Sequence, residues 1–320
     1  SGAFTHILAD TIKFAFDKEG GLKEFQALKN SRMIDQAENS EEQRLIVGET
    51  LSITGNTDTL QVRGKGPFGA TITSSDSEIF AEEFTVFLDK NNLESKRGVK
   101  AVLKPKKEEE NPIGIFSKEY PVFIRSREMR YFDEQKRFLF NGEIKAWQEK
   151  KILSADEIDL YKETGKIICT GKVKSILPQS KKEEEKEEER VDISSGRMVY
   201  EPKEKVVLYQ EGSSLKTKDF DLKAQSVFVY LKEEGEGIER IIARSKVSIY
   251  QNSVEGKGEG EEAIYEPEKK SIVLSGNPIF FDKDMGTTRG EKLTFYPADG
   301  RILVENKGKE RSVTVIKRER

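Results

Sequence analysis

The sequence predicts an all-β protein built from repeated antiparallel hairpins. Three observations predict it. About nine copies of one strand–turn–strand phrase recur along the 320 residues. Apolar and polar residues alternate inside each copy, as they do in a strand with one buried face. An apolar period of 3.6 residues persists nowhere over the length of an ordinary helix. A unit that cannot bury its own apolar face must stack on its neighbours, so we expect a long, curled antiparallel sheet.

The phrase is clearest in two copies near the C-terminus. In the first, residues 262–267 (EAIYEP) lead through 268–270 (EKK) into 271–276 (SIVLSG). In the second, residues 291–297 (EKLTFYP) lead through 298–300 (ADG) into 301–306 (RILVEN). Each copy therefore reads as a strand, a polar reversal and a second strand.

The first strand of each copy keeps apolar residues two positions apart, which places them on one face of the sheet. In chain order these residues are Ile12, Phe14 and Phe16; Leu51 and Ile53; Phe84, Val86 and Leu88; Met129 and Tyr131; Ile158 and Leu160; Met198 and Tyr200; Val227, Val229 and Leu231; Ala263 and Tyr265; and Leu293 and Phe295. The second strands continue the pattern with Leu60 and Val62, Phe138 and Phe140, Ile167 and Cys169, Val206 and Leu208, Ile272 and Leu274, and Ile302 and Val304. One face of the predicted ladder is therefore apolar.

Glycines follow several of these strands at a fixed offset. Gly64, Gly142, Gly171 and Gly276 each come two residues after the last apolar position of a strand. Glycine inside a strand pattern is typical of a bulge or sharp bend, which lets a sheet curl over on itself. The glycine-rich segment 256–260 has no buried strand before it and no amphipathic helix after it, which argues against a nucleotide-binding loop.

Composition and charge limit the class of protein. Hydrophobic and charged residues each make up 35% of the chain, which suits sheets with one wet face. The 55 basic and 58 acidic residues nearly cancel, so no strong field favours nucleic acid. The length allows one large or two ordinary domains. A Pro- and charge-rich stretch at 104–112 suggests a division into segments 1–115 and 116–320, the second with a charged loop insertion at 179–192.

The sequence offers few residues for covalent chemistry. His6 is the one histidine and Cys169 the one cysteine, so a Cys/His zinc site has too few ligands. Cys169 sits in an apolar strand pattern and is expected to be a buried structural thiol. Carboxylates such as Asp156 and Asp159 lie close together around Ile158. A glycosidase or lyase could use paired carboxylates of this kind, so these two enzyme classes are not formally excluded. We therefore predict no catalytic residue, no metal site, no cofactor and no enzyme activity.

The apolar face has two interpretations. Its side chains can fill a packed core, or they can line a groove that holds acyl chains, whose burial is worth about 0.8 kcal/mol per CH₂. Under the second interpretation the inward residues would contact lipid. These residues are Phe14, Phe84, Val86, Tyr131, Phe138, Phe140, Ile158, Leu160, Met198, Tyr200, Val227, Val229, Tyr265, Ile272, Leu274, Leu293 and Phe295.

The repeated phrases resemble the OstA-like family of periplasmic lipopolysaccharide-transport proteins, which contains LptA, LptC and the N-terminal domain of LptD. The resemblance rests on 263–267 (AIYEP), 272–278 (IVLSGNP) and 289–295 (RGEKLTF), and on 121–124 (PVFI), 140–144 (FNGEI) and 153–158 (LSADEI). It extends from about residue 120 to 310 and is looser over 1–115, where ADTI (9–12) and AEEF (81–84) keep the phrase.

The resemblance implies an elongated, twisted β-jellyroll of one module or two in tandem. It implies a non-enzymatic carrier or bridge that holds lipopolysaccharide acyl chains and passes them towards the outer membrane. It also implies a periplasmic location, with a signal peptide or N-terminal anchor before Ser1. Uncovered strands recruit other strands, so segments 4–16 and 312–316 are expected to join other transport proteins or a second copy head to tail. The rival is a structural or adhesive β-repeat scaffold with a packed core that binds protein or carbohydrate.

Overall fold

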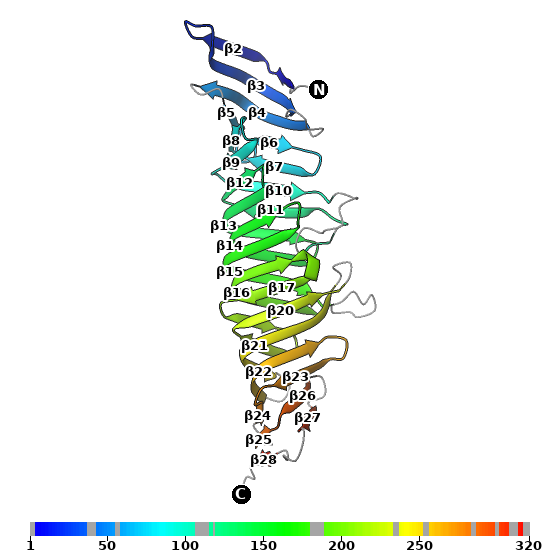
Figure 1. The fold of residues 1–320 in the computed structure, drawn as a ribbon. Coiled ribbons are helices and arrows are strands. Elements are labelled where there is room, and N and C mark those ends of the chain that lie inside the picture. Colours follow the sequence, from blue (N-terminus) through cyan, green and yellow to red (C-terminus); the bar gives the residue numbers. More distant parts are fainter. Residues whose placement is uncertain are drawn as a thin grey trace. The chain divides into compact units, whose positions relative to one another are not determined.

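The computed structural model describes residues 4–36, 43–54, 58–105, 115–117, 119–179, 189–232, 237–251, 256–282, 286–297, 301–306 and 313–315 (Figure 1). Two compact units divide the chain. Unit 1 comprises Ser1–Gln148 with Ser154–Ile167, and unit 2 comprises Glu149–Leu153 with Ile168–Arg320. The predicted division at residue 115 stays a prediction. Residues 180–188, most of the predicted charged insertion, lie outside the described residues, and a strand begins at Arg190.

The predicted all-β class is confirmed. Within the described ranges every regular element is a β-strand except one short 3₁₀ turn, η1 (Pro202–Glu204). The strands that lie entirely in unit 1 are β1 (Phe4–Leu8), β2 (Thr11–Phe16), β3 (Leu22–Gln36), β4 (Gln43–Thr54), β5 (Thr59–Arg63), β6 (Ala70–Thr73), β7 (Ser77–Ala81), β8 (Glu83–Phe87), β9 (Asn92–Ser95), β10 (Val99–Leu103), β11 (Val122–Ser126), β12 (Glu128–Phe132) and β13 (Arg137–Gln148).

Unit 1 consists of two antiparallel ladders joined by long strands. Ladder A runs through β2, the first half of β3, the second half of β4, then β5, β8, β9, β12 and the start of β13. Ladder B runs through β1, the second half of β3, the first half of β4, then β6, β7, β10, β11 and the end of β13. Because β3, β4 and β13 each belong to both ladders, one ladder folds back against the other.

Unit 2 repeats this plan with its own two ladders. Its strands are β16 (Arg190–Glu201), β17 (Val206–Gln210), β18 (Ser213–Lys216), β19 (Phe220–Ala224), β20 (Ser226–Leu231), β21 (Ile238–Gln251), β22 (Gly256–Glu266), β23 (Ser271–Ser275), β24 (Ile279–Asp282), β25 (Gly286–Arg289), β26 (Lys292–Tyr296), β27 (Arg301–Glu305) and β28 (Val313–Val315). The strands β14 (Lys151–Tyr161) and β15 (Lys166–Pro178) contribute residues to both units.

In unit 2, ladder A joins the second half of β16 to β17, β20, the first half of β21, the second half of β22, β23, β26 and β27. Ladder B joins the first half of β16 to β18, β19, the second half of β21, the first half of β22, β24, β25 and β28. Strands that pass from one ladder to the other form the predicted antiparallel β-jellyroll.

The long strands change ladder at sharp backbone kinks. At four of them two consecutive residues adopt positive φ: Lys29–Asn30, Gly142–Glu143, Gly171–Lys172 and Ser245–Lys246. The same backbone pair occurs at Glu211–Gly212 and Gly276–Asn277, which connect short strands of ladder A to short strands of ladder B. Two left-handed residues reverse the direction in which the strand curves, so the register of its pairing shifts there, as between Leu28 and Ser31. The sequence predicted bends at Gly64, Gly142, Gly171 and Gly276. The last three lie at such positive-φ pairs, whereas Gly64 follows β5 without a positive φ. The kinks at 29–30 and 245–246 contain no glycine and gave no such signal.

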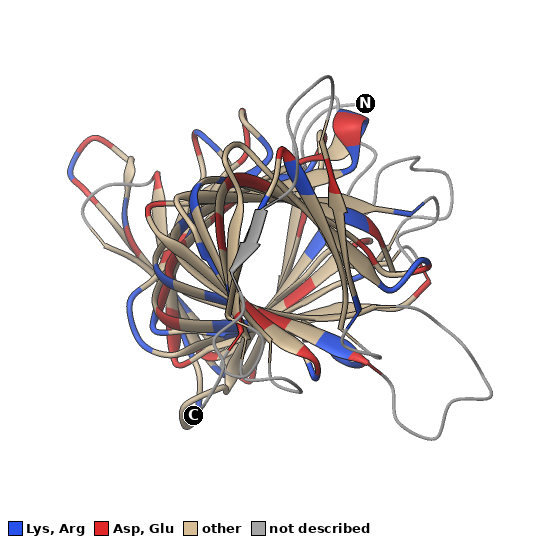
Figure 2. Ribbon diagram, turned by 90° about the horizontal axis from the view of Figure 1, so that it is seen from below, with Lys and Arg blue, Asp and Glu red and all other residues tan. Residues whose placement is uncertain are grey.

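Most charged residues lie on the outer faces of the ladders and in the turns. Figure 2 shows basic and acidic positions interspersed along turns and strands, with neither sign gathered on one region. Many are paired across neighbouring strands, as Arg244 is with Glu262 at 2.9 Å and Lys292 with Glu305 at 2.8 Å. These exposed pairs each contribute little to stability. Their distribution agrees with the near-zero net charge of the sequence.

Candidate functional site

The apolar face that the sequence predicted forms a continuous wall on ladder A of unit 2, with one correction: on β17 the inward side chains are Val207 and Tyr209, and the prediction of Val206 and Leu208 was wrong. The register aligns one row of side chains in the order Tyr200, Val207, Val229, Ile241, Tyr265, Ile272 and Phe295. A second row runs Met198, Tyr209, Val227, Ala243, Ala263, Leu274 and Leu293. Every one of these side chains is buried. Nine of the residues predicted to face inward therefore lie next to one another in space: Met198, Tyr200, Val227, Val229, Tyr265, Ile272, Leu274, Leu293 and Phe295.

Unit 1 has a matching wall on its own ladder A. There the register aligns Leu60 with Val86, Val86 with Leu93, Leu93 with Tyr131 and Tyr131 with Phe138. The neighbouring row contains Phe84 on β8 and the aligned pair Met129 and Phe140. All are buried except Tyr131, which is half-buried and whose hydroxyl donates a hydrogen bond to Asp133 at 3.0 Å. The predicted residues Ile158 and Leu160 are buried on β14.

Phe14 differs from the other predicted residues because its side chain is 58% exposed. It aligns with the buried Phe25 on β3, and the two rings lie 5.4 Å apart. Ile12 and Phe16 share its face of β2 and are exposed as well. Phe14 thus continues the apolar face beyond the last buried layer of unit 1, where it remains open to solvent.

The opposite wall was missed by the sequence reasoning. Ladder B of unit 2 aligns Ile193, Leu215, Leu222, Ile249, Gly258 and Phe280, and ladder B of unit 1 aligns Ile46, Ile72, Ile79, Ala101, Ile124 and Ala146. All of these residues are buried. The available signal was a second apolar alternation after each kink, as in FDLKA (220–224) and in KVSI (246–249).

The two walls of unit 2 touch through aromatic rings. Phe220 on ladder B meets Tyr265 on ladder A at 4.9 Å between ring centroids, and Phe280 meets Phe295 at 4.7 Å. Gly256 and Gly258 make room for these rings. A Cβ on Gly256 would lie 2.2 Å from the Phe280 ring, and one on Gly258 would lie 3.4 Å from Phe295. The glycine-rich segment therefore belongs to β22, where it shapes the interior.

The buried thiol and phenols of unit 2 stay protonated. Burial raises the pKa of the Cys169 thiol, which lies in the interior as predicted and is far from reactive. Burial likewise raises the pKa of Tyr200 and of Tyr265 to about 12, so both phenols stay protonated at physiological pH. No charged residue belongs to the aligned rows of either wall. Among the described residues, the aligned rows of unit 2 are thus two apolar walls that face each other, and the nearest buried carboxylate of β24 is Asp282, two residues after Phe280.

The described residues offer no candidate metal centre, because no group of three or more His, Cys, Asp or Glu residues among them is placed to hold a metal ion. In the same part of the chain no helix is long and apolar enough to cross a membrane. The aligned apolar walls are therefore the candidate site that the geometry supports.

Part of the chain is similar to a known protein family. Residues 192–301 match the family model described as LptA/(LptD N-terminal domain) LPS transport protein. This match confirms the resemblance that the repeated motifs predicted, over a segment that includes most of both unit 2 walls. No curated protein matches the chain. One similar solved structure is LptH from Pseudomonas aeruginosa, described as the LptA homologous periplasmic component of the conserved lipopolysaccharide transport device. It is 14% identical with a TM-score of 0.36, and the match covers 40% of this chain and 95% of LptH.

Proposed function

We propose that this protein is a non-enzymatic carrier in lipopolysaccharide transport that holds acyl chains between its two ladders. One observation carries the proposal: the residues that match the lipopolysaccharide-transport family model also bear the two aligned apolar rows of unit 2. Acyl chains gain about 0.8 kcal/mol for each CH₂ that leaves water. Two facing apolar walls can supply that burial without any covalent step.

The lipid-contacting residues in this proposal are the inward residues of ladder A. In unit 2 they lie along two rows that follow the stacking direction of the strands, so an acyl chain placed there would cross successive strands. In unit 1 Phe84, Val86, Phe138 and Phe140 take the same role. The exposed Phe14 would receive lipid, or a partner, at the open end of the wall.

The terminal strands support an assembly with other proteins. β2 pairs with β3, and the described residues provide no second neighbour for β2. Its edge can therefore accept a strand from another transport protein or from a second copy, head to tail. The last two strands in the chain are β27 and β28, which pair with β26 and β25, respectively. They offer the complementary edge. A periplasmic location, as for LptH, suits such a bridge.

A packed scaffold is the second candidate, and the burial of the interior favours it. The side chains of both walls have little surface open to water, and rings from opposite ladders are in contact. A protein of this kind would present its outer faces to protein or carbohydrate. The two candidates differ in whether the interior accepts an acyl chain.

A binding experiment separates them. The full-length protein is titrated with lipopolysaccharide that carries an environment-sensitive fluorophore on one acyl chain. We expect a saturable blue shift for the natural protein. Replacing the inward Ile241 with Asn should weaken binding about tenfold, because a polar amide beside the acyl chain is left without a hydrogen-bond partner.

The neighbouring Arg240 provides the matched control, because it is exposed and precedes Ile241 on the same strand. Arg240→Asn should leave binding unchanged, and circular dichroism checks that both variants fold. A natural protein that gives no saturable shift would favour the packed scaffold. Equal loss of binding in both variants would contradict the assignment of the inward rows.

A further inference from the structure

The free ends of the two ladders form two rims in each unit. The long strands turn back at the kinks, so the kinks line one side and the turns at the far ends of the ladders line the other. Turns 88–91 and 133–136 join strands of ladder A in unit 1 and define its rim A, whereas turn 74–76 joins strands of ladder B and lies on rim B. Any contact between rim A and rim B therefore closes the side opposite the kinks.

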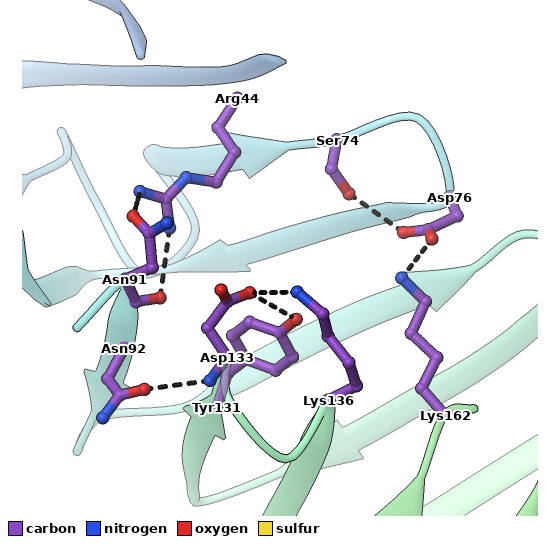
Figure 3. A network of polar contacts seen from close by, with 9 residues as sticks. All are labelled: Arg44, Ser74, Asp76, Asn91, Asn92, Tyr131, Asp133, Lys136 and Lys162. Atoms are coloured by element: carbon purple, nitrogen blue, oxygen red, sulfur yellow. Dashed lines mark hydrogen bonds and ion pairs between the residues drawn. The ribbon is translucent and has the colours of Figure 1, made fainter. Parts of the chain in front are cut away.

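Two polar contacts join the rims of unit 1 (Figure 3). Arg44, at the ladder B end of β4, donates hydrogen bonds to the carbonyl of Asn91 at 3.2 Å and to its side-chain oxygen at 2.6 Å. Asp76, in turn 74–76, forms an ion pair with Lys162. The backbone N–H of Lys162 donates to the carbonyl of Lys136 at 2.9 Å, which places Lys162 on rim A. Asp76 is buried, so the ion pair sits within the join.

Two buried glutamines perform the same task in unit 2. Gln179 follows β15 and is held on rim B by a backbone hydrogen bond to the carbonyl of Glu189 at 2.9 Å. Its own carbonyl accepts from the N–H of Ile238 at 3.0 Å, and its side-chain oxygen accepts from the Tyr265 hydroxyl at 3.3 Å. Ile238 and Tyr265 both lie at the rim A ends of their strands.

Gln251 makes the second join in unit 2. It ends β21 on rim B, and its side-chain nitrogen donates to the carbonyl of Pro297, just after β26 on rim A, at 3.3 Å. Both glutamine side chains are at least nine-tenths buried, at 4% and 3% exposure. A buried amide is costly to leave unpaired, so these contacts hold firmly while the rims are together.

We infer that these rim-to-rim contacts are latches that keep a lateral portal shut, and that acyl chains enter each unit sideways when they open. The inference rests on the proposed function and adds the route of entry. The walls are held by continuous backbone pairing, whereas the rims are joined at separated points by side chains and single carbonyls. An ordinary hydrogen bond shifts an opening equilibrium by only about two- to tenfold, so a few latches can release without unfolding the walls.

Closed latches account for the burial of the apolar side chains on both walls. With both rims joined, the apolar side chains collapse against one another and are hidden from water. Separating the rims lets an acyl chain replace those contacts while the polar headgroup stays outside. A lipid could thus be taken up along the side of a unit as well as through its open end.

Cys169 reports on opening without any lipid. Its thiol lies inside unit 2 and is fully buried, so a small methanethiosulfonate reagent can modify it only after the interior opens. In the full-length protein we expect the double variant Gln179→Ala, Gln251→Ala to be labelled about tenfold faster than the natural protein, the effect of losing a few ordinary hydrogen bonds.

Two controls separate latch release from unfolding. Gln225→Ala removes an exposed glutamine on the kink side, between β19 and β20, and should leave labelling unchanged. Val229→Ala weakens the wall itself and should lower the unfolding midpoint in denaturant without the same increase in labelling under native conditions. If Cys169 is modified at the same rate in the double variant and in the natural protein, the glutamine contacts do not hold the rims together. The same conclusion follows if Val229→Ala accelerates the modification as much as the double variant does.

Uptake of the fluorescent lipopolysaccharide then tests the portal. A double variant that is labelled faster and takes up lipid about tenfold faster, by stopped-flow fluorescence, supports both the portal and the carrier. Faster labelling with an unchanged rate of lipid uptake overturns lateral entry and leaves the carrier in place. Faster labelling with no lipid uptake by either protein overturns the proposed function, and the portal for lipid with it.

Discussion

Replacing Phe295 with alanine is expected to lower the free energy of unfolding by about 3–5 kcal/mol. The Phe295 ring is buried on ladder A, and it contacts Phe280 from ladder B at 4.7 Å. Truncation removes this contact between the walls and leaves a cavity, because β26 is held in place by its backbone pairing with its two neighbours, β23 and β27. Urea denaturation followed by circular dichroism measures the loss in the transition that reports on unit 2.

The matched control is Phe281→Ala on β24, in the opposite ladder. Phe281 is the neighbour of Phe280 but points outward and is 52% exposed. We expect its truncation to cost less than about 1 kcal/mol, since little apolar surface leaves water at this position on folding. Similar losses for both variants would contradict the description of Phe295 as a contact between two walls.

The second large effect is expected at Asp159. Its carboxylate accepts two hydrogen bonds from the Arg137 guanidinium, at 2.6 Å from Nε and 2.8 Å from Nη2. These bonds raise the pKa of Arg137, whose guanidinium also lies 5.5 Å from the Phe132 ring and 5.6 Å from the Tyr161 ring. Asp159→Ala would leave a partly buried cation without its bidentate partner, and we expect a loss of about 1.5–3 kcal/mol, the size of a hydrogen bond to a charged group.

Asp156→Ala tests whether the loss belongs to the pair. Asp156 lies on the same strand, but its side chain is exposed, so its replacement should change the free energy of unfolding by less than about 0.5 kcal/mol. Arg137→Lys should keep only part of the stability that the Arg137–Asp159 pair provides in the natural protein, because an ammonium cannot form the two parallel hydrogen bonds of a guanidinium. If Asp159→Ala cost no more than Asp156→Ala, the paired geometry would contribute little to the fold.

The sequence predicted the strands and one wall because both depend on local patterns. Alternation two residues apart identified Val229, Tyr265 and Phe295, and the register then placed them in one row. The wall on ladder B was harder to predict, because its strands are short and the alternation of apolar and polar residues begins anew after each kink. Leu222 and Ile249 are aligned in space, yet 27 positions separate them in a chain where the kink at 245–246 has no glycine.

The rim contacts could not be predicted from the sequence at all. Gln179 and Tyr265 are 86 positions apart, and Arg44 and Asn91 are 47 apart. Each of these residues is polar and lies at the end of a strand, where polar residues are common and do not indicate a partner. The partners meet only when the kinks fold ladder B against ladder A. At Phe14 the alternation predicted which face of β2 is apolar, but it could not predict that the side chain is exposed, with no covering layer among the described residues.

The most direct test of the account is photocrosslinking to lipopolysaccharide from single positions that carry a photoreactive amino acid. Phe140, Tyr265 and Phe295 are the inward positions, and the outward Lys145 and Lys292 are the controls. The account predicts crosslinks from the three inward positions and none from the two lysines, in proteins that circular dichroism shows to be folded. Folded proteins that crosslink from no inward position, or equally from the lysines, would contradict the claim that acyl chains lie between the walls.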